Sequence, residues 1–108
     1  MAALAMSQYD VYANPEHQRQ PNTPYLVVIQ SDHFIGARTA VVIPLVRNAE
    51  LKTTTAVNPS FEVNGESVVL EPFQIAFIPA RLLTQRIGSL QAERPLIVRA
   101  IDALMSGL

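Results

Sequence analysis

The centre of the expected fold is the stretch Tyr25–Ser31, which reads YLVVIQS. Residues 26–29 within it are apolar without interruption, and this run is too short for a typical helix. A continuous apolar run of this length is typical of a strand that other elements cover on both faces. We therefore predict a sheet with this segment in its interior.

Further strands are predicted on both sides of this segment, where short β-branched or aromatic runs are bounded by Pro, Asn or Gly. These strands are Gln8–Tyr12, Thr39–Leu45, Phe61–Val63, Ser67–Leu70 and Phe73–Ile78. The polar segment before Tyr25 holds three prolines and is typical of an exposed loop. The dipeptide Asn64-Gly65 predicts a type I′ hairpin that pairs Val63 with Glu66 and Glu62 with Ser67.

The last part of the chain has helical spacing. An apolar stripe that would face the core recurs at Ile97, Ile101, Leu104 and Leu108. Pro95 suits the first turn, and Gly107 is expected to end the helix. The opposite face carries Arg99, Asp102 and Ser106, with Met105 at its border. A shorter helix or turn is expected around Arg81–Leu90, broken at Gly88. Strands followed by a helix predict an α+β domain.

Composition indicates one globular domain. The chain has 108 residues, of which 49% are hydrophobic and 16% charged, and its net charge is −1. No cysteine is present, which excludes disulfides and cysteine-based zinc sites. The positive charges do not gather, so direct nucleic-acid binding is disfavoured. No apolar run is long enough to span a membrane. We expect a cytoplasmic protein with one domain at 8–108 and a disordered extension at 1–7.

No catalytic constellation is evident. Ser31, Asp32 and His33 are adjacent, but neighbouring strand residues point to opposite faces, whereas a catalytic triad converges from separate segments. Glu62 and Glu66 are out of register across the hairpin, which argues against paired acid–base work. Two histidines without cysteine or HExxH spacing predict no metal site, and the glycines form no nucleotide-binding motif. The residues thus indicate a protein that is not an enzyme and needs no cofactor.

The order of several short motifs resembles the CcdB family of toxins from bacterial toxin–antitoxin modules. The resemblance begins near Gln8 and covers nearly the whole chain. It rests on the Gln-Ser-Asp block that follows the central strand, on the Val-Ile-Pro-Leu block at 42–45, and on the terminal Gly107-Leu108. Each motif is short, so the match is specific through the order and spacing of the motifs.

This resemblance implies an SH3-like barrel of the CcdB/MazF type with a small extra sheet and a C-terminal α-helix. It also implies a homodimer that binds the A subunit of DNA gyrase and traps the enzyme with its DNA cleaved. A cognate CcdA-like antitoxin would neutralise the toxin, and their complex would repress its own operon. Contact with DNA would then be indirect, and the toxin would have no catalytic residue.

Carried over by position, the gyrase contacts fall on two segments. They are His33 and Phe34 after the central strand, and Asp102, Met105, Ser106, Gly107 and Leu108 at the end of the helix. The best-known members of the family end in an aromatic residue, tryptophan, glycine and isoleucine. Ser106 therefore stands where those members carry tryptophan, a residue type that often contributes 2 kcal/mol or more at an interface, roughly 30-fold in affinity.

Two alternatives remain open. Relatives with the same barrel cleave RNA, which requires a basic groove and an arginine that converges with a Ser or Thr. Arg38, Arg47 and Arg81 are available, but the sequence does not gather them. The second alternative is a non-toxic protein that only binds the antitoxin or serves regulation, which the serine at position 106 makes credible.

Overall fold

The apolar stretch that we placed inside the sheet forms strand β2, Tyr25–Val28, and all four of its residues are buried. In this computed structural model, which describes residues 6–34, 37–47 and 56–106, β2 lies between two antiparallel neighbours. One neighbour is β1, Asp10–Ala13, and the other is β3, Thr39–Arg47. Burial on both faces explains why the run needs no polar residue.

Strand β3 pairs with β2 along one edge, and two further strands pair with different parts of its other edge. Its C-terminal part pairs with β5, Glu66–Leu70, which in turn pairs with β4, Ser60–Val63. Its N-terminal part pairs with β6, Ala76–Pro79. Together with β7, Arg86–Ser89, the strands form one antiparallel sheet in the order β4-β5-β3-β2-β1-β7, with β6 joined to β3.

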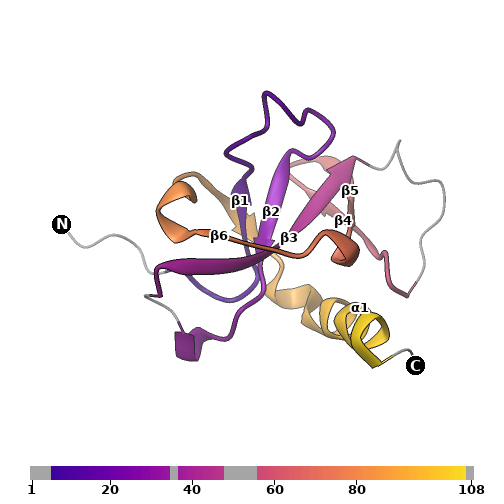
Figure 1. The fold of residues 1–108 in the computed structure, drawn as a ribbon. Helices are drawn as coiled ribbons and strands as arrows, with labels where there is room; N and C mark the ends of the chain where they lie inside the picture. Colours follow the sequence, from indigo (N-terminus) through magenta and orange to yellow (C-terminus); the bar gives the residue numbers. More distant parts are fainter. Residues whose placement is uncertain (1–5, 35–36, 48–55, 107–108) are drawn as a thin grey trace.

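This sheet curls into a half-barrel, with the helix α1, Arg94–Ser106, on one side (Figure 1). The architecture is the mainly antiparallel α+β fold of SH3-like type that the sequence analysis expects. The small extra sheet of that expectation is the β4–β5 hairpin, which stays joined to β3. Short 3₁₀ turns in the described connections are η1 (Asp32–Phe34), η3 (Pro72–Gln74), η4 (Ala80–Leu82) and η5 (Gln91–Glu93).

The two faces of the sheet bury separate apolar clusters. The larger cluster lies between the sheet and α1, where Ile97 and Ala100 of the helix meet residues such as Val27, Ile43 and Leu70. The smaller cluster consists of Tyr12, Leu26, Val28, Ala40, Val42 and Leu83. Met6, Ile78 and Ala80 pack against this smaller cluster. Alternation along each strand divides the side chains between the two clusters, as a period of two requires.

The hairpin turn is confirmed in detail. Asn64 and Gly65 have φ angles of 54° and 78°, the two positive values that a type I′ turn needs. Val63 is opposite Glu66, and Glu62 is opposite Ser67, as predicted. The predicted helix is also confirmed, with Pro95 in its first turn. Gly107 and Leu108, the expected stop and the last apolar residue, lie outside the described residues.

Several predicted strand boundaries differ from the structure, and three of these differences have identifiable reasons. Tyr9 has a φ of 70°, so the first strand begins at Asp10 and not at Gln8. Pro72 opens a 3₁₀ turn that includes Phe73, which delays β6 until Ala76. The expected strand Tyr25–Ser31 ends at Val28, before the η1 turn.

The segment predicted as a helix or turn around Arg81–Leu90 is mainly a strand. Only η4 is helical there, whereas β7 pairs with β1. Gly88 lies opposite Val11, and the register shifts between Val11 and Tyr12, so that Tyr12 lies opposite Arg86. Local apolar spacing favoured a helix. The unpaired N–H and C=O groups at the outer edge of β1 instead recruit this segment, because such groups need hydrogen-bond partners when they are buried.

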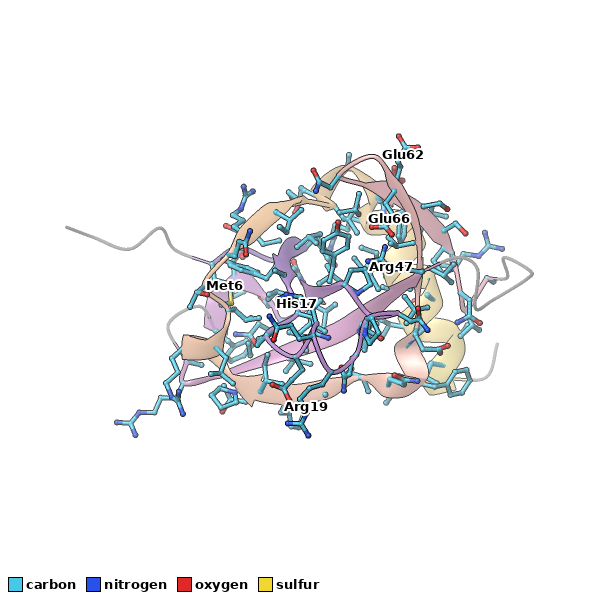
Figure 2. All side chains as sticks on the ribbon, turned by 90° about the horizontal axis from the view of Figure 1, so that it is seen from above. Met6, His17, Arg19, Arg47, Glu62 and Glu66 are labelled. Carbon is cyan, nitrogen blue, oxygen red and sulfur yellow. The ribbon has the colours of Figure 1, made fainter. Side chains whose placement is uncertain are left out.

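Among the residues that the structure describes, two ion pairs connect distant parts of the chain. Arg47 at the end of β3 pairs with Glu66, and its Nε also donates to the carbonyl of Pro21, 3.0 Å away. Figure 2 shows Arg47 and Glu66 directed toward each other. Arg86 donates to the buried carboxylate of Asp10 at 3.2 Å. This hydrogen bond and the charge of Asp10 raise the pKa of Arg86.

Candidate functional site

The end of α1 exposes a group of residues that the sequence analysis singled out. Ile97 and Ala100 anchor the first half of the helix in the core, so Asp102 and Ser106 face solvent. Met105 is 77% exposed, a large value for an apolar side chain. Interfaces are enriched in methionine, and an exposed methionine beside a carboxylate and a hydroxyl offers both apolar contact and hydrogen bonding.

Ser106 uses its hydroxyl inside the helix. Its Oγ donates to the backbone carbonyl of Asp102 at 2.6 Å, which is the i to i−4 bond typical of serine in helices. This bond satisfies the hydroxyl proton within the chain. At this position the side chain thus offers a partner little apolar area, together with an oxygen that can still accept a hydrogen bond.

The second predicted contact region is the turn η1. Phe34 is 66% exposed, and His33 is exposed beside it. The backbone N–H of His33 donates to Ser31 Oγ at 3.1 Å, whereas the N–H of Gln8 donates to Asp32 Oδ1 at 2.7 Å. Ser31 and Asp32 therefore accept bonds from backbone amides, an arrangement typical of a turn and not of a catalytic relay.

The structure does not bring the two contact regions together in one protomer. Figure 1 places η1 and the last turn of α1 far apart along the same side of the molecule. A turn that does contact the helix is η3, with Phe73 at its centre. The carried-over residues thus form two separate patches.

An apolar patch that the sequence analysis did not single out lies on η3 and β6. Phe73 is 70% exposed and Phe77 is 73% exposed, with Ile75 between them exposed as well. We name Phe73, Ile75 and Phe77 the β6 patch. Ile75 directly precedes β6 and lies two residues from Phe77, a spacing that gives a common face in extended backbone, and Phe73 precedes them in η3. Whether other elements cover that face could not be read from the sequence.

Strand β6 also has an open edge among the described residues, since it pairs with β3 alone. The N–H of Ala80 donates to the carbonyl of Arg38 at 2.8 Å, so Ala80, Ile78 and Ala76 direct their backbone groups toward β3. The N–H and C=O of Phe77 consequently point outward. An edge with exposed aromatic side chains and free backbone groups is typical of a surface that pairs with another chain.

A cleft lies where β3 begins and β6 ends. It has a volume of about 650 Å³ and is lined by Ala37, Arg38, Thr39, Pro79, Ala80 and Arg81. The pairing of Thr39 with Pro79 brings the two arginines to one site, although 43 positions separate them in the sequence. Arg47, the third arginine considered in the sequence analysis, is committed to Glu66 elsewhere.

The remaining candidate groups have local roles. The Nδ1 of His17 is 2.9 Å from the backbone carbonyl of Asn14, and Figure 2 shows this histidine within the polar loop before β2. Across residues 6–34, 37–47 and 56–106 there is no group of three or more His, Cys, Asp and Glu side chains that could hold a metal ion. No helix in the described part of the chain has the length and apolar character to cross a membrane.

Comparison with known proteins agrees with the motif order and with the fold. A search of curated proteins found no match. The model of one protein family, described as "CcdB protein", matches residues 8–107, which is nearly the whole chain. The chain therefore belongs to the CcdB family, whose members are toxins of toxin–antitoxin systems.

Proposed function

We propose that the protein is a toxin that binds the A subunit of DNA gyrase and traps the enzyme with its DNA cleaved. The observation that carries this proposal is the end of α1, where Met105 stands 77% exposed beside Asp102 and Ser106. Family membership supplies the target class. We assign Gly107 and Leu108 to the same contact surface, with His33 and Phe34 as a second contact region. The protein acts by binding, with no catalytic residue and no cofactor.

The active form in this proposal is a homodimer. The β6 patch and the outward N–H and C=O of Phe77 support it, because a monomer gains nothing by exposing large apolar side chains along an open strand edge. Two-fold pairing covers such a surface with an identical one. The proposed dimer interface is thus the β6 patch, next to the helix that η3 contacts.

A cognate antitoxin is the second partner. A disordered segment that folds on the native toxin stabilises the toxin by mass action, by about 2.7 kcal/mol at a hundredfold excess over Kd. The toxin–antitoxin complex would repress its own operon, so the toxin contacts DNA only through its partners. Both proposed targets, gyrase and operator DNA, place the protein in the cytoplasm.

One observation supports the endoribonuclease alternative, because Arg38, Thr39 and Arg81 line the same cleft. Cleavage of RNA also needs a group that takes up a proton near neutral pH. Among the residues that the structure describes, those that line the cleft include neither histidine nor a carboxylate. We therefore prefer gyrase binding, and RNA degradation after induced expression would reverse this preference. Binding of antitoxin without any gyrase poisoning would instead favour the regulatory alternative.

The proposal is tested with purified gyrase and supercoiled plasmid, by measuring the linear DNA that each variant produces. The natural protein should act weakly on a gyrase that tryptophan-bearing family members poison. Ser106→Trp should strengthen poisoning, up to about 30-fold, because an exposed indole adds large rigid contact area. Thr84→Trp adds a similar area at an exposed position outside both contact regions and should change nothing.

Removal of Gly107 and Leu108 should abolish poisoning and leave the circular dichroism spectrum unchanged, since the helix Arg94–Ser106 keeps its buried residues Ile97 and Ala100. Full potency after this truncation would place the gyrase contact elsewhere. Absence of linear DNA with the natural protein and with Ser106→Trp would overturn the gyrase assignment.

A further inference from the structure

The cleft at the start of β3 is built by the backbone. Thr39 pairs with Pro79, and the N–H of Ala80 donates to the carbonyl of Arg38. These contacts fix the two chain segments side by side, so that Arg38, just before β3, and Arg81, in the η4 turn after β6, line one cleft. The arrangement depends on sheet register, which a slip of one residue would destroy.

The charges in the cleft are unbalanced. Three of the described arginines, Arg19, Arg47 and Arg86, form ion pairs with carboxylates. Within the described part of the chain, Arg38 and Arg81 take part in no ion pair and no acidic residue lines their cleft. Two guanidinium groups at one site repel each other and attract an anion. Planar guanidinium groups match carboxylates with two parallel hydrogen bonds.

The size and walls of the cleft indicate what kind of anion fits. At about 650 Å³ it falls within the range of sites for organic ligands and exceeds the needs of a single small ion. Ala37, Pro79 and Ala80 add apolar surface, and Thr39 adds a hydroxyl. A peptide segment with acidic side chains presents carboxylates and aliphatic stems together, which suits both features.

We propose that the Arg38–Arg81 cleft binds the carboxylates of an acidic, extended segment of a partner protein. Nucleic acid is the less favoured anion, because its recognition relies on a basic stripe and this chain has a net charge of −1. The identification of that partner as the antitoxin rests on the proposed function. The binding site itself does not.

The test is a binding titration of the full-length protein with three probes of equal length. They are a synthetic peptide that alternates glutamate and alanine, its glutamine counterpart, and an oligouridylate RNA. The glutamate peptide should bind and the glutamine peptide should not. The double variant Arg38→Gln, Arg81→Gln should weaken binding about tenfold, as expected for the loss of two exposed charge pairs.

A matched control removes two charges elsewhere. Arg94→Gln, Arg99→Gln changes the net charge equally on the exposed face of α1 and should leave the affinity unchanged. Equal weakening by both double variants would reduce the effect to net charge and overturn the site. Tighter binding of the RNA, lost with Arg38 and Arg81, would make the cleft a nucleic-acid site, and no peptide binding at all would also refute the proposal. Gyrase takes no part in this titration, so its outcome is independent of the plasmid assay.

Discussion

The two strands that share one edge of β3 differ sharply in exposure. Strand β5 pairs with the C-terminal part of β3, and its last three residues, Val68, Val69 and Leu70, are fully buried. Strand β6 pairs with the N-terminal part of the same edge, yet none of its four residues is buried. The backbone pairing is of the same antiparallel kind in both halves, so pairing alone does not account for the contrast.

The contrast arises from what lies beyond each strand. Strand β4 covers the outer edge of β5, and Phe61 and Val63 of β4 join the main core. No described strand lies beyond β6, and the β6 patch remains exposed. One half of the edge is therefore completed within the chain, and the other half is left for a second chain. A sheet edge that is covered along only one half indicates that the exposed half becomes buried when the chain assembles with another.

The largest expected effect is loss of stability in the closed half. Leu70→Ala removes a fully buried side chain from the main core and should lower the free energy of unfolding by about 2–5 kcal/mol. Ile78→Ala is the matched change in the open half, where the side chain is only half-buried, and should cost about 1 kcal/mol. Urea denaturation at equal protein concentration measures both. Equal losses would show that the two halves are equally important to the folded protomer.

The next effect concerns assembly. Phe77→Glu places a charge in the proposed dimer interface and should weaken self-association by at least about 30-fold, equivalent to 2 kcal/mol. The side chain is 73% exposed, so the protomer should stay folded. Phe34→Glu changes a residue of similar exposure outside the β6 patch and should leave self-association intact. Sedimentation velocity over a dilution series distinguishes these outcomes, and an unchanged dimer in Phe77→Glu would move the interface elsewhere.

The closed half was largely predictable from sequence, because its signals are local. The hairpin follows from Asn64-Gly65, and the burial of β2 follows from its unbroken apolar run. The helix was predictable for the same reason, since Ile97 and Ile101 lie one turn apart. Strand β7 was not predictable, because its pairing with β1 joins residues more than 70 positions apart and its apolar spacing also fits a helix.

Some parts of the candidate sites could likewise be predicted from local sequence pattern, and others depend on pairing between distant segments. The exposed positions Asp102 and Ser106 follow from helical periodicity once the buried face is known. The Arg38–Arg81 cleft has no counterpart in local pattern, since only the pairing of β3 with β6 brings these arginines together. The β6 patch is visible as an alternation in the sequence, but its exposure depends on the absence of a covering strand among the described residues.

A smaller effect is expected in the turn of the β4–β5 hairpin, which covers the outer edge of β5, and it measures what this turn contributes to stability. Gly65 has a φ of 78°, where a side chain is strained, although no atom of the described residues beyond its two chain neighbours lies within 4 Å of the position that a Cβ would take. Gly65→Ala should therefore cost about 1 kcal/mol through backbone conformation alone. Gly88 in β7 is equally open and lacks a positive φ, so Gly88→Ala should cost much less. Thermal unfolding of both variants checks this, and equal costs would contradict the conformational account.

The smallest effect is a dependence on alkaline pH in the smaller cluster, against which Ile78 of the open half packs. Burial, followed by the negative charge of Asp10, raises the pKa of Tyr12 above its ordinary value of 10.0. The unfolded chain therefore loses this phenolic proton first as the pH rises. Because the folded state holds the proton more tightly, the contribution of Tyr12 to stability is complete below pH 10 and is lost as the pH rises through the folded pKa.

Tyr12→Phe has no phenolic proton to lose. Above pH 10 the free energy of unfolding should therefore fall less in the variant than in the natural protein, whereas below pH 10 the difference between the two proteins should not change with pH. Denaturant titrations of the two proteins at a series of pH values measure this difference, and a difference that stays constant across pH 10 would show that the phenol does not titrate differently on folding.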